Sequence, residues 1–461
     1  MSDLVYSQVV EKASRYQAKS LEFLGKIIQF PTVSPRDKDG LRACAEELVK
    51  QFEKSGFEAS IFDTTGDPVV MAEKNVGAKK NLLFYHHYDV QPEGSLELWD
   101  SSPWKMEVRG DRVYGRGAVD DKGPIAASLM GIMLAEEMLE QLPVNVRFVI
   151  EGEEEAGSIS LHEFTETNRD FLRAEGLVWE GISSMPNSPA EIICGVKGDA
   201  YFELRASGPP NFPRTDVHSG EAPCVPNAAW RLIWALNTLK DKDENILVDG
   251  FQDEVVQPSD EDIAVLAEYE GDYAKRIMDD YDLGKTLLDR KGIELLKHLY
   301  FMPTLTISGL TSGYQGAEDM TIVPSSASAK LDVRLVPNLT PEKVHELLKA
   351  HLAKKGYDDI EVKMSPGYLP SRSRINDPFI RMVHELSKEV VAPAPSNIVP
   401  MVGGSGPAHF FTPYAPMCMA YSYSDLQHTN GHAPNENAWL PSLIHNVAFI
   451  AMVADRMSQL P

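Results

Sequence analysis

Residues 81–90, NLLFYHHYDV, join a run of apolar and aromatic side chains to a polar segment. Such a short run predicts a buried β-strand, with polar residues where it ends. Helical and strand patterns alternate on both sides of it, which predicts a mostly parallel α/β sheet covered by helices on both faces. We expect helices at about 41–53 and 124–139, and further strands at 144–150, 176–179 and 192–196.

The middle of the chain follows a different pattern. Its elements come in the order β-α-β-β-α-β, which is the ferredoxin-like split motif. An acidic stretch, about 241–301, interrupts this motif. We therefore expect an α/β domain, residues 1–198 and 371–461, into which an α+β domain, residues 199–370, is inserted. The strands expected in the insertion lie at 200–206, 304–310, 327–336 and 360–364, and the helices at 228–239 and 341–352.

The composition argues against several classes of protein. The 461 residues include 44 Lys and Arg against 68 Asp and Glu, for a net charge of −24. So acidic a surface repels phosphate backbones, and we expect no nucleic-acid partner. We also expect no membrane association, because no apolar run approaches the roughly 18 residues of a membrane span and residues 1–19 lack the order of a secretory signal. Four scattered cysteines without a CxxC indicate free thiols, so we expect a cytoplasmic protein.

Ionisable residues gather where the predicted strands end, and ligands of open α/β sheets bind outside the carboxyl ends of strands. His87 and Asp89 lie on the same side of an extended segment. Asp89 could orient the His87 ring directly or lie beneath a metal ion. The alternative is a polar pair on the surface. His86 points the other way, and we expect a structural role for it.

The loop GRGAVDDKG at residues 115–123 precedes a predicted helix. A glycine-rich loop in this place could bind phosphate, but the spacing matches neither common phosphate fingerprint. The favoured interpretation is that the glycines let the backbone approach a site served by Asp120. One carboxylate can bridge two cations with its two oxygens. Asp121 is the rival for that role.

Three further clusters complete the set. Residues 151–157, EGEEEAG, hold four carboxylates directly after an apolar strand, which is costly unless cations neutralise them. The alternative is a solvated acidic loop. Adjacent carboxylates can divide the work, one binding metal and the other acting as base. Glu180 ends another short apolar run, and His432 lies near the C-terminus with His428 as a competitor.

Together these clusters supply imidazoles and carboxylates without thiolates, which suits zinc, manganese or cobalt better than a structural zinc site. Two imidazoles and three carboxylates are too many ligands for one four-coordinate ion. They suit two ions that share a bridging carboxylate and a water. The candidate ligands are His87, Asp120, Glu155, Glu180 and His432.

At this point the sequence resembles the M20 family of metallopeptidases, and within it the carnosinase-like cytosolic dipeptidases. The matching motifs span nearly the whole chain in the family's order. They are His87-x-Asp89, GRGAVDDKGP from Gly115, Glu154-Glu155-x-Gly157-Ser158, Asp216-Val217-His218-Ser219-Gly220, Arg334-Leu335-Val336-Pro337-Asn338, Gly403-Gly404-Ser405 and His432-x-x-Asn435-Glu436.

The resemblance implies a role for each matching position. The five candidate ligands match the family's metal ligands, with Asp120 bridging two zinc ions. Glu154 matches the general base and Asp89 the acid behind the metal-bound histidine. His218 matches a residue that reaches the partner subunit's active site, since the family is usually homodimeric through its inserted lid and dimerisation domain. Positions that match substrate-binding residues are Thr321, Arg334 and Ser405.

The function expected from these implications is hydrolysis of the amide bond of a dipeptide by metal-activated water. Two departures bear on the substrate: Glu180 stands where this subgroup usually has Asp, and Met401 where the animal enzymes place Arg. An N-acyl amino acid deacylase or carboxypeptidase on the same scaffold is therefore the nearest alternative. A metal-free binding protein built on an inactive hydrolase is the alternative from another class. Without the resemblance, His218 reads as a turn residue and Arg334 as an edge charge.

Overall fold

The computed structural model describes residues 4–461, and its largest element is an eight-stranded sheet. The central strands β6-β3-β7-β18 run parallel, as do β8 and β17 at one edge, whereas the β1–β2, β2–β6 and β18–β8 pairs are antiparallel. The mostly parallel sheet that the sequence predicts is confirmed. In spatial order the strands are β1 (Glu58–Phe62), β2 (Val69–Lys74), β6 (Asn145–Glu151), β3 (Asn81–His87), β7 (Gly176–Ile182), β18 (Met417–Ser422), β8 (Ala190–Ile193) and β17 (Ser396–Val399).

The apolar run in β3 is continuous because both of its faces are buried. Leu82 and Phe84 belong to one core cluster, together with residues of α1 to α4, α12 and α14. Leu83 and Tyr85 belong to another, together with residues of α5 and α6. These helices are α1 (Tyr6–Ala13), α2 (Gln17–Ile28), α3 (Lys38–Lys54), α4 (Lys122–Leu139), α5 (Leu161–Thr167), α6 (Arg169–Leu172), α12 (Pro378–Val391) and α14 (Leu440–Met457).

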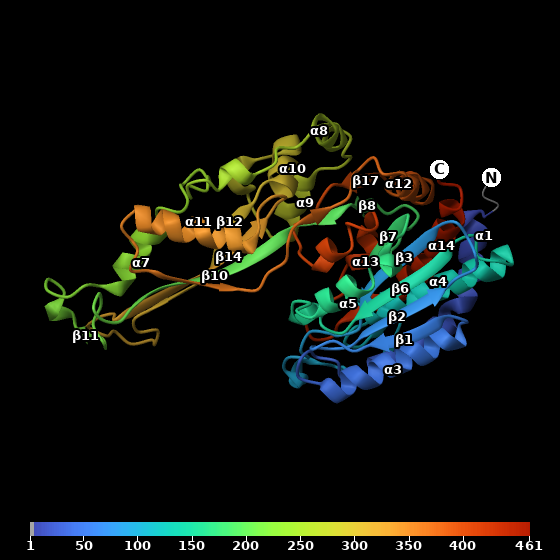
Figure 1. Ribbon diagram of the computed structural model, residues 1–461, viewed down its shortest axis with the longest axis horizontal. Helices are drawn as coiled ribbons and strands as arrows, with labels where there is room; N and C mark the ends of the chain where they lie inside the picture. The colour runs from blue at the N-terminus through green and yellow to red at the C-terminus, as the bar shows by residue number, and fades with distance from the viewer. Residues whose placement is uncertain (1–3) are drawn as a thin grey trace.

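The second sheet is antiparallel throughout, with the order β12-β14-β10-β15. With α7 and α11 packed against it, the chain order is the predicted β-α-β-β-α-β, and its buried residues form a core cluster of their own. Figure 1 shows this part extending away from the large sheet, with β11 at its far tip. The bounds are β10 (Gly198–Ser207), β11 (Val217–His218), α7 (Ala228–Leu236), β12 (Thr304–Ser312), β13 (Ile322–Val323), β14 (Ser326–Leu335), α11 (Pro341–Lys354) and β15 (Glu361–Ser365).

The acidic stretch forms three helices that pack against the edge of the large sheet. Their apolar residues share a core cluster with Ile193 and Val399 at the edge of the large sheet. Asp262 forms a bidentate ion pair with Arg372, at 2.9 and 3.2 Å. The stretch is therefore anchored rather than a free surface loop. The helices are α8 (Asp260–Ala267), α9 (Tyr273–Asp280) and α10 (Gly292–Phe301).

Two expected strands differ in their bounds. The strand expected at 192–196 is divided, because the chain leaves the large sheet after Ile193 and pairs as β9 (Gly195–Val196) with β16 (Ser371–Arg372). The strand expected at 176–179 continues to Ile182, so Glu180 lies within β7 rather than after it. No helix among residues 4–461 is long and apolar enough to cross a membrane.

Candidate active site

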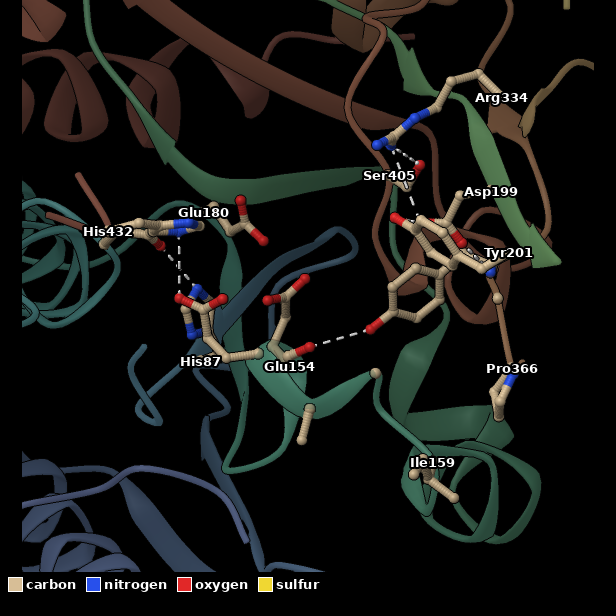
Figure 2. Close-up of a pocket in the computed structure, with 16 residues that line it drawn as sticks. His87, Glu154, Ile159, Glu180, Asp199, Tyr201, Arg334, Pro366, Ser405 and His432 are labelled. Atoms are coloured by element: carbon tan, nitrogen blue, oxygen red, sulfur yellow. Dashed lines mark hydrogen bonds and ion pairs between the residues drawn. The ribbon is translucent and has the colours of Figure 1, made fainter. Parts of the chain in front are cut away.

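A cavity of about 610 Å³ lies between the carboxyl ends of β3 and β7 and the neighbouring ends of β10 and β14 (Figure 2). Eight of the eleven predicted site residues line it, although they come from both sheets and from four connecting segments. The structure thus brings together residues as far apart in sequence as 87 and 432. The eight are His87, Asp120, Glu154, Glu155, Glu180, Arg334, Ser405 and His432.

His87 is the last residue of β3, and its side chain is almost fully buried. Its Nδ1 lies 3.1 Å from the Asp89 carbonyl oxygen and 3.5 Å from Asp89 Oδ1. Burial opposes a charged imidazole, but hydrogen bonds to Asp120 and Asp89 outweigh burial and raise the pKa of His87 well above 6.5. The Asp89 carboxylate also accepts from the backbone N–H groups of Glu154 and Glu155, at 3.1 and 2.9 Å. One buried acid therefore orients both His87 and the Glu154–Glu155 turn.

Asp120 presents its two oxygens to two imidazoles. Oδ1 lies 3.0 Å from His87 Nε2, and Oδ2 lies 2.8 Å from His432 Nε2. Asp121 turns the other way, where its Oδ2 lies 2.7 Å from His86 Nδ1. Of the two neighbouring aspartates, Asp120 is the one whose oxygens face two candidate metal ligands.

The loop that carries Asp120 is held by Glu436, a residue to which the sequence analysis assigns no role. The Glu436 carboxylate is 1% exposed and accepts from the backbone N–H groups of Gly117, Val119 and Asp120 at 3.1–3.2 Å. It also accepts from Arg116 Nη1 at 2.6 Å. Glu436 belongs to the motif at 431–436, but nothing local indicates that it reaches a loop some 300 residues earlier.

Three groups lie close enough to share a cation: Asp120, Glu155 and His432 each offer a ligand atom within 4.8 Å of the others. Glu155 Oε1 is buried and accepts no hydrogen bond in the described part of the chain, although His432 Nε2 lies 3.4 Å away. Glu155 Oε2 accepts from Gln91 Nε2 at 2.7 Å. Imidazole and carboxylate donors with an unsatisfied buried oxygen fit a divalent cation.

Two more carboxylates border this group. Burial, with neighbouring Asp121 and Asp120, raises the pKa of Glu180 to about 8. Burial, with neighbouring Glu180 and Glu155, raises the pKa of Glu154 well above 4.5. Buried carboxylates that lie this close together are stable as anions when cations lie among them. The raised pKa values and the types of ligand residue therefore both point to a site for divalent cations.

The opposite wall comes from the second sheet and from the loop at residues 403–405. Arg334 Nη1 donates to Ser405 Oγ at 2.9 Å and lies 3.9 Å from Asp199 Oδ2. Figure 2 shows Arg334 and Ser405 on the opposite side of the cavity from His87 and His432. A guanidinium that faces the candidate metal ligands can bind the carboxylate of a small molecule whose other end lies among those ligands.

Three lining residues with polar side chains are absent from the sequence prediction: Asp199, Tyr201 and Tyr368. The first two lie two positions apart in β10 and so share a face, a signal that was lost because the strand was expected to begin at residue 200. Tyr368 follows β15 in a Pro-Gly-Tyr loop, and its hydroxyl donates to the Glu154 carbonyl oxygen at 3.1 Å. No local pattern marks that loop as part of a site.

His218 and Thr321 lie elsewhere. The Ser219 N–H donates to the Thr321 carbonyl oxygen at 3.0 Å, and β11 pairs with β13, so these residues are close to each other. Both are exposed, and neither lines the cavity. The strand β11 lies at the tip of the molecule farthest from the large sheet (Figure 1). Within one chain, the structure therefore does not bring these two residues to the other nine.

Known proteins resemble this chain over most of its length. Residues 83–456 match the model of peptidase family M20/M25/M40. The Beta-Ala-His dipeptidase of Rattus norvegicus is 29% identical over 322 residues, or 67% of this chain and 63% of that protein, so the match spans less than two thirds of that relative. An M20 family metallo-carboxypeptidase from Sulfolobus solfataricus is 33% identical, with a TM-score of 0.85 over 96% of this chain and 100% of that chain. Human carnosine dipeptidase 1 is 25% identical, with a TM-score of 0.76 over 99% and 100%.

Proposed function

The chain belongs to peptidase family M20/M25/M40, and from that premise we propose that it hydrolyses the amide bond of dipeptides with two divalent metal ions. Zinc is the first candidate for these ions, and manganese and cobalt are the alternatives. The observation that carries the proposal is Asp120, whose two oxygens face His87 and His432 at 3.0 and 2.8 Å. Arg334 stands across the same cavity, where it can bind a free carboxylate. Similarity to proteins named as dipeptidases supports the substrate class.

In the proposed reaction, bound divalent ions would lower the pKa of water and polarise the scissile carbonyl. Glu154 takes a proton from the attacking water and passes it to the leaving amine. Asp89 keeps His87 and the Glu154 turn in place. Arg334 and Ser405 hold the C-terminal carboxylate of the substrate. Because this carboxylate must lie close to the scissile amide, the substrates are restricted to short peptides. The residues proposed to hold the ions, with Asp120 as the bridge, are His87, Asp120, Glu155, Glu180 and His432.

We propose that residues 199–370 act as a lid and dimerisation domain between the catalytic segments 1–198 and 371–461. The separate sheet and core of the insertion support this division. Two stacked tryptophans on α7, Trp230 and Trp234, are 54% and 53% exposed and support a homodimer through this region. In such a dimer, His218 and Thr321 would complete the active site of the partner subunit. We also propose a cytoplasmic location, which the four free cysteines support.

A second candidate function is that of a carboxypeptidase or N-acyl amino acid deacylase. The 33% identity to an M20 family metallo-carboxypeptidase over nearly the whole chain favours it, as does Glu180. Both candidate functions use the same reacting groups, and they differ in whether the substrate must have a free N-terminal amine. A binding protein on an inactive hydrolase is the weakest candidate, because the ligand residues and Glu154 are all present around one cavity.

The test is hydrolysis of a panel by metal-loaded protein: dipeptides, the same dipeptides N-acetylated, and N-acetyl amino acids. Glu154→Gln keeps the shape of the side chain and should lower kcat about 10²- to 10⁴-fold. Removal of metal by a chelator should abolish turnover, and zinc or manganese should restore it. Cleavage of free dipeptides alone supports the dipeptidase, and cleavage of acylated compounds alone supports the deacylase. If nothing is cut, with or without Glu154, the catalytic proposal is wrong.

A further inference from the structure

The two chain segments that connect the second sheet to the rest of the protein cross each other at the wall of the candidate active site. At the start of β10, the Asp199 N–H donates to the Tyr368 carbonyl oxygen at 3.0 Å. The Tyr368 N–H, after β15, donates in return to Asp199 Oδ1 at 2.8 Å. A Cβ on Gly367 would lie 2.2 Å from the Asp199 carbonyl oxygen, and one on Gly198 would lie 2.4 Å from the Tyr368 carbonyl oxygen. Only glycine allows backbones to approach this closely, so the crossing is tightly packed.

One end of this crossing lies at the wall that is proposed to bind the substrate carboxylate. Asp199 is 6% exposed, lines the cavity and is the strand partner of Arg334. Its Oδ2 lies 3.9 Å from Arg334 Nη1, which donates to Ser405 Oγ at 2.9 Å. Figure 2 shows Asp199 on the same side of the cavity as Arg334 and Ser405. The position of Asp199 is therefore tied to that of the carboxylate-binding groups.

The other end of the crossing lies at the turn that carries the proposed base. The Tyr368 hydroxyl lies 3.1 Å from the Glu154 carbonyl oxygen and 3.1 Å from Ser158 Oγ. Ser158 Oγ donates in turn to Glu151 Oε1 at 2.9 Å. Glu151 is the last residue of β6 and is 1% exposed. The Tyr368 hydroxyl is therefore held against both the Glu154 turn and a residue anchored in the large sheet.

We infer that Asp199 and Tyr368 form a bridge that sets the distance between the carboxylate-binding wall and the Glu154 turn. The bridge selects substrates in which a single carbon separates the carboxylate from the nitrogen of the scissile amide. The inference rests on the proposed function, in which the carboxylate and the amide are held at the same time. A misplacement of about 1 Å can cost about 10²-fold in rate, so a fixed distance becomes a selection for substrate length. Both residues act through other groups and are positioning residues.

The experiment compares Gly-Gly with Gly-β-Ala, which has one more methylene between the scissile amide and the carboxylate. The wild type, loaded with metal, should prefer Gly-Gly by about 10²-fold in kcat/KM. Tyr368→Phe removes the hydroxyl and should narrow this ratio about threefold to tenfold, the loss expected for one hydrogen bond. For Gly-Gly the loss should be in kcat rather than KM, because Arg334 still binds the carboxylate. Partial unfolding or loss of metal lowers both activities equally and leaves the ratio unchanged.

Two substitutions of Asp199 separate its geometry from its charge. Asp199→Ala removes the acceptor of the Tyr368 N–H and should narrow the ratio, whereas Asp199→Asn keeps an oxygen there and should retain the wild-type ratio. Tyr281→Phe makes the same change as Tyr368→Phe at a side chain that is 69% exposed and outside the cavity, and it should leave the ratio unchanged.

Circular dichroism establishes that each variant is folded, and Tyr368→Phe keeps the test valid if Asp199→Ala does not fold. If the wild type cuts both dipeptides equally well, or if neither Tyr368→Phe nor Asp199→Ala changes the ratio, the bridge does not set the spacing.

If the wild type cuts no dipeptide, the comparison is made with N-acetylglycine and N-acetyl-β-alanine, which have the same two spacings. A variant-dependent ratio there supports the bridge while the dipeptidase proposal fails. Cleavage with an unresponsive ratio overturns the inference alone. No cleavage of any compound overturns the proposed function and the inference together.

Discussion

Replacing Glu436 by glutamine should destabilise the protein through a group that is far from it in sequence. Arg116 and Glu436 are each 1% exposed and form a 2.6 Å ion pair. Removing one partner of a buried pair leaves an uncompensated charge, which costs about 3–5 kcal/mol. The glutamine amide also places N–H groups where backbone N–H groups of the Asp120 loop need an acceptor. We therefore expect the free energy of unfolding to fall by about 3–5 kcal/mol.

Urea unfolding measures this loss, followed by tryptophan fluorescence because the Trp99 ring lies 5.4 Å from the Arg116 guanidinium. The double variant Arg116→Met/Glu436→Gln also removes the unpaired charge of Arg116 and should be more stable than Glu436→Gln alone. Glu53→Gln, on the exposed side of α3, is the matched control and should change stability by less than about 0.5 kcal/mol.

The same substitution should weaken metal binding about 10- to 100-fold, because groups that orient a ligand affect affinity to that extent. Calorimetric titration of metal-free wild type and Glu436→Gln measures the difference. A stability loss below about 1 kcal/mol, a double variant no more stable than the single one, or unchanged metal affinity would each refute the proposed role of Glu436 in holding the Asp120 loop.

Three further predictions concern other parts of the molecule. Arg334→Met should lower kcat/KM for Gly-Leu about 10- to 100-fold and leave hydrolysis of Gly-Leu amide unchanged. The reason is that only the substrate with a free carboxylate forms a charged hydrogen-bonded pair with Arg334. An equal loss for both substrates would contradict this role. His218→Ala should lower turnover about 100-fold or more. Refolding this variant together with Glu154→Ala should restore activity, because one of the two sites in the mixed dimer contains both wild-type residues. If no activity returns, His218 does not belong to the partner's site. Burial and the nearby charge of Arg334 lower the pKa of Lys197 from 10.5 to about 8, so between these pH values the unfolded chain keeps a proton that the folded chain has released. Urea unfolding should therefore show the stability of the wild type rising with pH across this window relative to that of Lys197→Met. A stability difference between the two proteins that does not change with pH would contradict the lowered pKa.

Much of the fold follows from local patterns in the chain. The apolar run at 82–85 predicts a strand buried on both faces, and β3 is buried in that way. The order β-α-β-β-α-β predicts the second sheet, because each of its elements carries its own periodicity. The polar residues after the apolar runs identify where a site is, since parallel strands bring their carboxyl ends to one edge. For these features the sequence alone was sufficient.

The choice between neighbouring residues came from the tertiary structure. Asp120 and Asp121 are chemically identical, and what separates them is that one faces His87 and His432 while the other faces His86. Long-range packing set this, since Glu436 holds the backbone of the Asp120 loop.

Tyr368 and Asp199 could not be predicted for the same reason, because they reach the cavity through contacts between the start of β10, the segment after β15 and the Glu154 turn. The same reason also explains the position of β11, the strand that ends at His218, at the far tip. Periodicity records which face of an element is buried, and so the sequence by itself determined the elements and the edge that carries the chemistry. Loop conformation and the placement of one sheet against the other depend on contacts between residues hundreds of positions apart, which is why only the tertiary structure decided which side chains meet.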